Sequence, residues 1–306
     1  MISAFIGIDW SGAKGARQPG IQISMAMPGS AVPETIIAGD GRHWGREGVR
    51  DWLLARAEAA GDGPVLVGID FAFAHPFHDE TAYYPGQAAS PPDAPRLWQL
   101  VESVCADDPH LYGGAMFAAP GFGDYYLSPK NHGAPHYRSR RRLTEAAARA
   151  SARAPSPTFK AIGADNVATG SMAGMRLIHA LKAALGPRLA VWPFDQVTPD
   201  RLAGLDMVLV EIFPSYYFHA AGLNPARNAA TEADFMNVAL AAYDSDGVGP
   251  DYAPRGADAD EADAIISSAA LRHFAGRPGC WQECWPECWQ APPAAAQEGW
   301  IFGVPA

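Results

Sequence analysis

Apolar runs that end on a carboxylate recur along this chain. Residues 5–9 read Phe-Ile-Gly-Ile-Asp and residues 64–70 read Pro-Val-Leu-Val-Gly-Ile-Asp, so both runs finish on an aspartate. A third run, residues 207–212, carries Glu211 just before its last residue and is soon followed by Pro214. Short apolar runs bounded by Gly, Ser or Pro are typical of buried strands. The pattern therefore predicts three strands with acidic side chains at their carboxyl ends.

Weaker alternation at residues 21–27 and 34–38 predicts two more strands close behind the first. Because the connections are short, these strands and the first should form an antiparallel meander. Apolar residues at helical spacing then predict a helix over residues 45–60, and the run at 64–70 should return parallel to the first strand. This order opens an RNase H-like α/β fold: a mixed sheet, made of a three-strand antiparallel meander plus parallel strands, flanked by helices.

The regular rhythm stops after residue 71. Pro, Gly and aromatic residues are frequent as far as residue 160, so we interpret approximately 72–160 as a large insertion after the fourth strand, within a single domain that spans 1–306. Further helices are predicted at 95–105, 137–153, 174–185, 216–221, 231–243 and 258–275, and further strands at 189–192, 207–212 and 299–304.

Residues 277–306 form a Cys- and Trp-rich C-terminal extension. Cys280, Cys284 and Cys288 are each followed by a tryptophan. Their spacing is compatible with a metal site, but Pro286 interrupts any helix there. We expect the tryptophans to pack this segment onto the body of the protein. Zinc remains the lesser alternative, since the histidines and cysteines form no HExxH motif and no paired CxxC motif.

Composition narrows the class of protein. The chain has 306 residues, of which 48% are hydrophobic, and a net charge of −10. An acidic balance argues against a protein that coats nucleic acid through bulk charge, although a local basic patch is compatible with it. The first residues reach an aspartate early without a basic leader, and no apolar run approaches the ~20 residues of a membrane span. We expect a soluble cytoplasmic protein with reduced thiols and no membrane partner.

The strand-end acids are the strongest candidate chemistry. Asp9, Asp70 and Glu211 should meet at one edge of the sheet, because parallel strands open onto a common crevice at their carboxyl ends. Asp263 lies in the last long predicted helix, with Asp260 one turn earlier. Carboxylates this close repel one another, and Mg²⁺ or Mn²⁺ resolves the conflict. Two such ions about 4 Å apart would clamp a phosphodiester. The alternative is that each acid is a cap or a surface charge.

Short motifs in the same order resemble domain-of-unknown-function family 429. They are Ile-Gly-Ile-Asp at 6–9, Gly-Ile-Asp-Phe-Ala-Phe at 68–73, Val-Glu-Ile-Phe-Pro at 210–214, Asp-Ala-Ile-Ile at 263–266 and Glu-Gly-Trp-Ile at 298–301. The family is regarded as predicted nucleases of RNase H-like fold, distantly similar to Holliday-junction resolvases. The resemblance covers the two ends of the chain and leaves the middle third unmatched. It implies metal ligation by Asp9, Asp70, Glu211 and Asp263.

The turn after Asp9 keeps a second class of enzyme open. Residues 10–14 read Trp-Ser-Gly-Ala-Lys, which departs from the usual nuclease loop, and Ser11 and Lys14 are suited to binding a phosphate. Actin-like ATPases and sugar kinases begin in the same way. They require a second Gly-rich phosphate turn, and Asp70 is not followed by glycine. A hydrolase of small phosphate esters and a catalytically inactive binding protein are further alternatives.

Arginines just before residue 143 are the other feature with a functional interpretation. Arg138, Arg140, Arg141 and Arg142, here called the arginine run, concentrate positive charge in an acidic protein. They fit a clamp on the phosphate backbone of nucleic acid. The alternative is a solvated face, or arginines paired with the protein's own acids. His75 follows Asp70 closely and is a candidate to contact the substrate beside the metal site, although most such histidines are structural.

Overall fold

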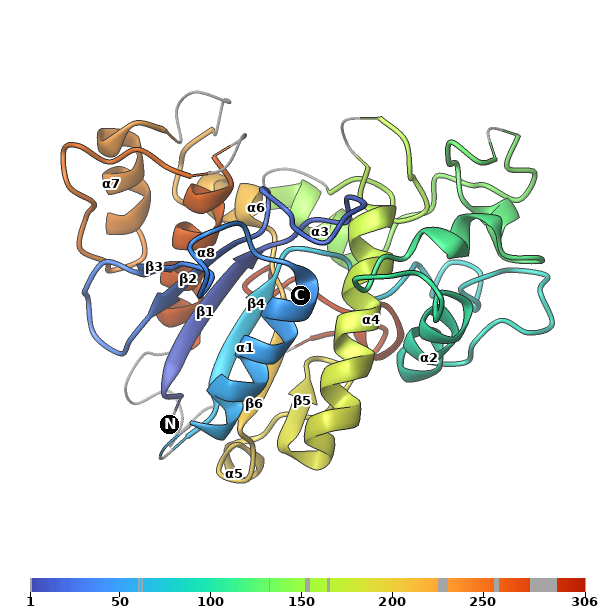
Figure 1. The fold of residues 1–306 in the computed structure, drawn as a ribbon, viewed down its shortest axis with the longest axis horizontal. Helices are drawn as coiled ribbons and strands as arrows, with labels where there is room; N and C mark the ends of the chain where they lie inside the picture. Colours follow the sequence, from blue (N-terminus) through green and yellow to red (C-terminus); the bar gives the residue numbers. More distant parts are fainter. Residues whose placement is uncertain are drawn as a thin grey trace.

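A six-stranded mixed sheet organises the fold (Figure 1). The computed structural model describes residues 2–59, 61, 63–131, 133–151, 155–163, 166–224, 231–255, 259–275 and 291–305. The strands are β1 (Ala4–Asp9), β2 (Gln22–Ala26), β3 (Glu34–Ile36), β4 (Val65–Ile69), β5 (Leu189–Val191) and β6 (Met207–Glu211). Their order across the sheet is β3-β2-β1-β4-β6-β5.

The pairing of the strands matches the predicted arrangement. β1 pairs antiparallel with β2, and β2 pairs antiparallel with β3, so the first three strands form a meander. β4 pairs parallel with β1 on one side and with β6 on the other. β5 adds a parallel edge strand beside β6. The α/β class with a mixed sheet is therefore confirmed.

Helices cover both faces of the sheet. They are α1 (Arg46–Glu58), α2 (Ala94–Val104), α3 (Leu143–Ser151), α4 (Ala168–Leu185), α5 (Pro199–Leu202), α6 (Pro214–Ala220), α7 (Ala233–Ala241), α8 (Asp260–Ala275) and α10 (Ala295–Glu298), with short 3-10 turns at η1 (Gly114–Ala118), η2 (Gly123–Tyr125) and η3 (Gly186–Arg188). One core cluster joins α1, α2 and α4 to one face, and a second joins α6, α7 and α8 to the other. In Figure 1, α1 and α4 lie in front of the sheet.

Close packing of α8 on β1 positions the first turn of this helix at the end of the sheet that carries the predicted acids. A Cβ atom added to Gly7 would lie 2.5 Å from the Ala264 carbonyl oxygen and 2.7 Å from the Ser268 nitrogen. Only glycine at this position lets the helix backbone approach the strand so closely. The first turn of α8 therefore lies beside the carboxyl end of β1, where Asp9 stands.

Several predicted elements differ from the observed structure, among them α4, which begins at Ala168 instead of near residue 174. The helix expected over 137–153 begins only at Leu143, because the Glu145 side chain reaches back to accept a hydrogen bond from the Arg142 backbone N–H at 3.2 Å. An acid at the third position of a helix that accepts from the backbone N–H preceding the helix is a signal for a helix start. The terminal strand expected near 299–304 is reduced to one bridge between Glu211 and Ile301. The Cys-Trp repeat of the C-terminal extension lies outside the described residues.

In its described residues, the region predicted as an insertion carries helices of at most 11 residues. α2, η1, η2 and α3 are separated by turns, and α2 packs against α4. The Trp98 indole donates a hydrogen bond to the Phe73 carbonyl oxygen at 2.8 Å, which fastens α2 to the segment that follows β4. Over the residues with a described placement, none of the helices combines the length and the apolar character needed to span a bilayer.

Candidate carboxylate site

Strand register places three of the predicted acids side by side. Ile8 of β1 is level with Ile69 of β4, and Ile69 is level with Glu211 of β6. Asp70 follows directly, and its backbone N–H donates to the Ile8 carbonyl oxygen at 3.0 Å. Adjacent strands lie about 4.8 Å apart. The ends of β1, β4 and β6 therefore bring three carboxylates to one edge of the sheet.

α8 adds two more acids to the same edge. Asp260 and Asp263 occupy its first turn and line, together with Asp9, Asp70 and Glu211, one cavity of about 770 Å³. This volume lies within the roughly 300–1,000 Å³ range of small-molecule sites. The structure thus assembles all five predicted acids around a single space, although they come from positions as far apart as 9 and 263 in the chain.

Mutual repulsion marks the aspartates as one electrostatic unit. Removal from bulk water raises the pKa of Asp9 well above its ordinary 3.8, and the carboxylates of Asp263 and Asp70 raise that pKa further. Burial likewise raises the pKa of Asp70, with Asp263 and Glu211 as its acidic neighbours. For Asp263, burial and then the charge of Asp260 raise the pKa to about 7. Like charges held this close favour either protons or a cation.

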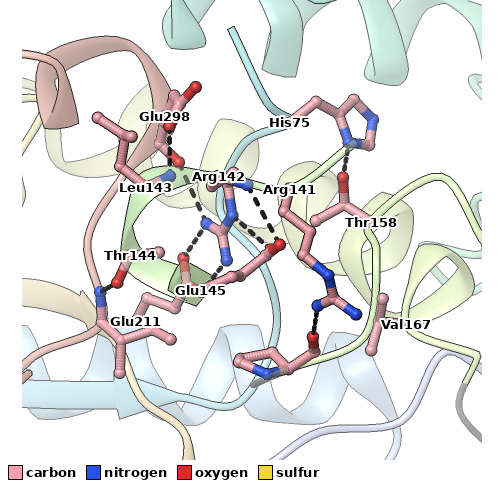
Figure 2. Close-up of polar contacts among 12 residues, drawn as sticks. His75, Arg141, Arg142, Leu143, Thr144, Glu145, Thr158, Val167, Glu211 and Glu298 are labelled. Carbon is pink, nitrogen blue, oxygen red and sulfur yellow. Dashed lines mark hydrogen bonds and ion pairs between the residues drawn. The ribbon is translucent and has the colours of Figure 1, made fainter. Parts of the chain in front are cut away.

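Glu211 differs from the aspartates because a buried arginine neutralises it. Figure 2 shows Arg142 between Glu145 and Glu211. Its Nη2 atom donates to Glu211 Oε1 at 2.5 Å, and Nη1 donates to Oε2 at 2.7 Å. The Phe73 backbone N–H donates to the same Oε2 at 3.1 Å. Both oxygens of Glu211 are thus engaged by protein donors, in the two-pronged geometry that arginine favours.

Arg142 also binds a second acid and the chain near the C-terminus. Its Nε atom donates to Glu145 at 3.0 Å, and Nη1 donates to the Glu298 carbonyl oxygen at 3.1 Å. Burial raises the pKa of Glu145 to about 7, against the opposing attraction of Arg142. The two acids hold the pKa of Arg142 above its ordinary value in spite of burial. The side chains of Arg142, Glu145 and Glu211, here called the buried triad, are each at most 4% exposed.

The Glu298 carboxylate joins the segment after β4 to the start of α3, next to Arg142. One of its carboxylate oxygens accepts from the backbone N–H groups of Phe77 and His78 at 2.7 and 2.6 Å. The other accepts from the backbone N–H of Leu143 at 2.8 Å, where α3 begins. A carboxylate at a helix N-terminus satisfies an otherwise unpaired donor and complements the helix dipole. Arg142 therefore has hydrogen-bond partners in three parts of the chain: Glu145 in α3, Glu211 at the end of β6 and the backbone of Glu298.

The turn after Asp9 is held by hydrogen bonds from a buried arginine and lies against α4. The buried Arg46 side chain donates to the carbonyl oxygens of Ser11 and Ala13 at 3.0 and 2.9 Å. A Cβ atom on Gly12 would lie 2.2 Å from the Gly170 nitrogen, so this turn contacts the first turn of α4. Ser11 and Lys14 both line the cavity, and their contact with a substrate stays a prediction. The Ser11 hydroxyl also accepts from the Ala13 N–H at 3.3 Å.

The arginine run does not form the exposed basic face that a phosphate clamp requires. Arg140 is 8% exposed and donates to the Asp79 carboxylate and to three backbone carbonyl oxygens. Arg141 is exposed and donates to the Pro155 carbonyl oxygen. Arg138 is exposed and lies by a separate small pocket. Only Arg142 lines the main cavity, and the protein's own acids hold it. The alternative of arginines paired with internal acids holds for Arg140 and Arg142.

His75 lies apart from the carboxylates. It is fully buried, and its two ring nitrogens are hydrogen-bonded to the Thr158 hydroxyl at 2.9 Å and the Tyr126 hydroxyl at 2.8 Å. The ring stacks on Phe159 with 4.2 Å between centroids. Burial and then the nearby Arg140 lower its pKa well below 6.5, which keeps the imidazole neutral. Its position thus corrects the prediction that it contacts a substrate, and it serves as a packing residue.

Several residues of the site carry no signal that sequence reasoning used. Arg46 and Glu145 are charged residues in ordinary surroundings in the sequence, and Glu298 belongs to a short motif but received no role; Arg46 and Glu298 are held by contacts distant in the chain. Ser215 lines the cavity, and its hydroxyl is buried without a hydrogen-bond partner among the described residues. The spacing of Arg142 and Glu145, with the acid as the third residue of the helix, is a sequence signal that could have predicted where α3 begins.

The donor set matches the cations that the sequence predicts. Aspartate carboxylates are hard oxygen ligands, which suit Mg²⁺ and Mn²⁺. The Ser215 hydroxyl, which has no hydrogen-bond partner in the described part of the chain, offers one more oxygen at the cavity wall. In the described part of the chain, however, no three His, Cys, Asp or Glu side chains are already arranged as a metal-binding group. A cation would have to draw the aspartate side chains closer together.

Comparison with known proteins adds no relative. No protein-family model matches this chain, and neither a search of curated proteins nor a search of solved structures found a match. The resemblance of the short sequence motifs to domain-of-unknown-function family 429 therefore stays a prediction.

We expect the metal-free protein to lose stability as the pH rises from about 4 to 7, in part through Asp263. Its pKa is about 7 in the fold against an ordinary 3.8, so the native state binds more protons than the unfolded chain in this window. The contribution reaches at most about 1.4 kcal/mol per pH unit. Melting temperatures measured with EDTA between pH 5 and 8 should fall less steeply for Asp263→Asn than for wild type.

The comparison of two slopes is needed because His75 acts in the opposite direction. Its lowered pKa removes stability as the pH falls below 6.5 in wild type and variant alike. Asp107→Asn, at an exposed position, is the matched control and should follow wild type. Parallel slopes for wild type and Asp263→Asn would contradict the prediction.

Proposed function

We propose that this protein is a metal-dependent nuclease that hydrolyses nucleic-acid phosphodiesters with Mg²⁺ or Mn²⁺, on an RNase H-like fold. The observation that carries the proposal is the convergence of Asp9, Asp70 and Asp263 on one cavity, with pKa values raised by burial and mutual repulsion. Clusters of perturbed carboxylates in a cleft are typical of functional sites. The sheet order, with an antiparallel meander followed by parallel strands, supports the fold assignment.

Each residue of the site has a role in this scheme. Asp9, Asp70 and Asp263 would hold the cation, with Asp260 one turn away on α8. A bound divalent cation supplies activation of water and neutralisation of charge on the phosphate. Glu211 is paired with Arg142 and oriented by it, so this ion pair shapes the field at the end of β6. Lys14 stands exposed at the cavity, where an ammonium group attracts a phosphate.

The geometry favours hydrolysis over the phosphotransferase alternative. An actin-like kinase requires two related α/β halves with a phosphate turn in each, whereas the described residues hold one six-stranded sheet. Both the Ser11 hydroxyl and the Ala13 N–H of the first turn are engaged with each other. The two positions after Asp70 are occupied by Phe71 and Ala72, both buried, instead of a glycine turn.

The test is a panel of substrates incubated with the purified chain, with Mn²⁺, Mg²⁺ or EDTA. Single-stranded DNA, single-stranded RNA and a branched DNA report nuclease activity, and p-nitrophenyl phosphate reports activity on small esters. We expect cleavage of at least one nucleic acid that EDTA abolishes. ATP hydrolysis without nuclease activity would instead favour the phosphotransferase. No hydrolysis of any substrate with either cation would favour the inactive binding protein.

A further inference from the structure

A second hollow, here called the basic groove, lies at the meander side of the sheet. Its volume is about 380 Å³, and it is lined by Arg17, Ile21, Gln22, Thr35, Ile36, Ile37, Ala38, Gly41, Arg42, His43, Trp44 and Arg255. The floor is apolar, and the rim carries three arginines and a histidine, all exposed. Within the described residues, the rim arginines come from three segments that are distant in the sequence.

The basic groove opens at the same end of the sheet as the carboxylates. Asp9 of β1 pairs with Gln22 of β2, and Ile23 pairs with Ile36 of β3. At about 4.8 Å between strands, the groove therefore begins one strand spacing from Asp9. Gly20 lines the main cavity and the next residue, Ile21, lines the groove; a Cβ atom on Gly20 would lie 3.7 Å from Asp260 Oδ2. A ligand strand that leaves the carboxylates along this edge of the sheet would reach the groove next.

Contacts beneath the groove fix its shape. The buried Glu261 accepts from the Thr35 hydroxyl at 2.6 Å and from the Arg255 backbone N–H, which holds the Arg255 segment over β3. On the opposite wall, the Trp44 indole donates to the Ile36 carbonyl oxygen at 3.0 Å. This bond occupies an edge of β3 that would otherwise pair with another strand. The groove is therefore preformed, and its floor suits a flat apolar group better than an added strand.

Charge at the rim is opposite to that of the protein as a whole. Asp40 is ion-paired with Arg17 and also accepts from the Arg42 backbone N–H, so among the described residues the rim sets three arginines against this one aspartate. The chain has a net charge of −10, and the cavity next to the groove is strongly acidic. Positive groups over an apolar floor are the combination that binds single-stranded nucleic acid, with phosphates on the rim and bases below.

We propose that the basic groove binds single-stranded nucleic acid that extends from the carboxylate cavity. This inference rests on the proposed nuclease function, because it assigns the substrate of that site: a strand whose unpaired bases reach the floor of the groove. Arg42 and Arg255 contact phosphates, and the exposed Ile37 contacts a base. The groove takes the place of the clamp that the sequence had assigned to the arginine run.

The experiment measures binding without hydrolysis. A short fluorescein-labelled oligothymidylate is titrated with the protein in EDTA at several salt concentrations, with fluorescence anisotropy as the readout. For Arg42→Gln/Arg255→Gln we expect affinity to fall at least about tenfold, as for the loss of two charge-assisted contacts. The slope of log affinity against log salt should become shallower by about 1.4, since each lost phosphate contact of a single strand is worth about 0.7.

Controls separate the groove from bulk charge and from another class of ligand. Arg96→Gln/Arg201→Gln removes two exposed arginines on α2 and α5 and should bind as wild type. Equal losses in both double variants, no binding by wild type, or full competition by polyglutamate would overturn the proposal, the last in favour of an acidic peptide. The nuclease assay is scored separately. Cleavage with unchanged binding in Arg42→Gln/Arg255→Gln rejects the groove alone, and groove-dependent binding without cleavage rejects the nuclease alone.

Discussion

Asp9→Asn should abolish Mn²⁺-dependent hydrolysis and at the same time stabilise the metal-free protein. We expect kcat to fall at least about a thousandfold, because a bound cation contributes several kcal/mol to the transition state and each tenfold in rate corresponds to about 1.4 kcal/mol. In EDTA at pH 8, loss of one charge from the cluster of Asp9, Asp70 and Asp263 should raise the free energy of unfolding by on the order of 1 kcal/mol.

The opposite signs of these two effects separate a functional acid from a structural one. Asparagine keeps an oxygen that can accept the Trp10 backbone N–H, now bonded to Asp9 Oδ1 at 3.0 Å, so the turn should survive. Mn²⁺ should raise the melting temperature of wild type more than that of the variant. Asp107→Asn is the control and should match wild type in both assays. Retained activity in Asp9→Asn, or a loss of stability, would reject a shared cation site at Asp9.

Arg142→Met should lower the free energy of unfolding by about 3–5 kcal/mol. The substitution leaves Glu145 and Glu211 buried without their cation, and Glu145 is inaccessible to solvent. It also removes the donor to the Glu298 carbonyl oxygen. Urea unfolding followed by circular dichroism at pH 7.5 measures the effect. Arg142→Lys should recover only part of the loss, since an ammonium group cannot bridge both oxygens of Glu211.

Two further variants test whether the loss of stability in Arg142→Met comes from unpaired buried charge or from altered packing. Arg138→Met removes an exposed member of the arginine run and should change stability by less than about 0.5 kcal/mol. Arg142→Met/Glu145→Leu/Glu211→Leu replaces the whole buried triad with apolar groups and should regain most of the stability, because no buried charge remains unpaired. A loss below about 1 kcal/mol in Arg142→Met would show that the triad is more hydrated than its burial indicates.

The strand-end acids could be predicted because a strand has only two faces and two ends. Apolar residues at 5–8 and 65–69 require burial on both faces, and a carboxylate at the next position can only stand at the edge of the sheet. Parallel pairing of β1, β4 and β6 then collects these edges, whatever the rest of the chain does. The position of Asp263 follows less directly from the sequence, since a helix can place its first turn at many points around a sheet.

The roles of the arginines could not be predicted in the same way. Five consecutive positions rich in arginine indicate a solvated face on average, yet Arg140 and Arg142 are buried because Asp79, Glu145 and Glu211 surround them in the fold. Those partners lie up to 69 residues away in the chain. Conversely, Arg17, Arg42 and Arg255 look isolated in the sequence and meet only where β2, β3 and the segment before α8 come together.

The sequence alone therefore determined the α/β class, the meander with its parallel return, and the acids at the strand tips, because those follow from local periodicity and from the geometry of a sheet. Only the tertiary structure decided which charges face solvent, which neutralise one another and which border a cavity. Pairing energies and burial depend on distances between segments, and no local pattern encodes those distances. Asp9, Asp70 and Asp263 emerge as a repelling cluster, Glu211 as a neutralised neighbour, and the surplus positive charge lies over β3 instead of at the arginine run.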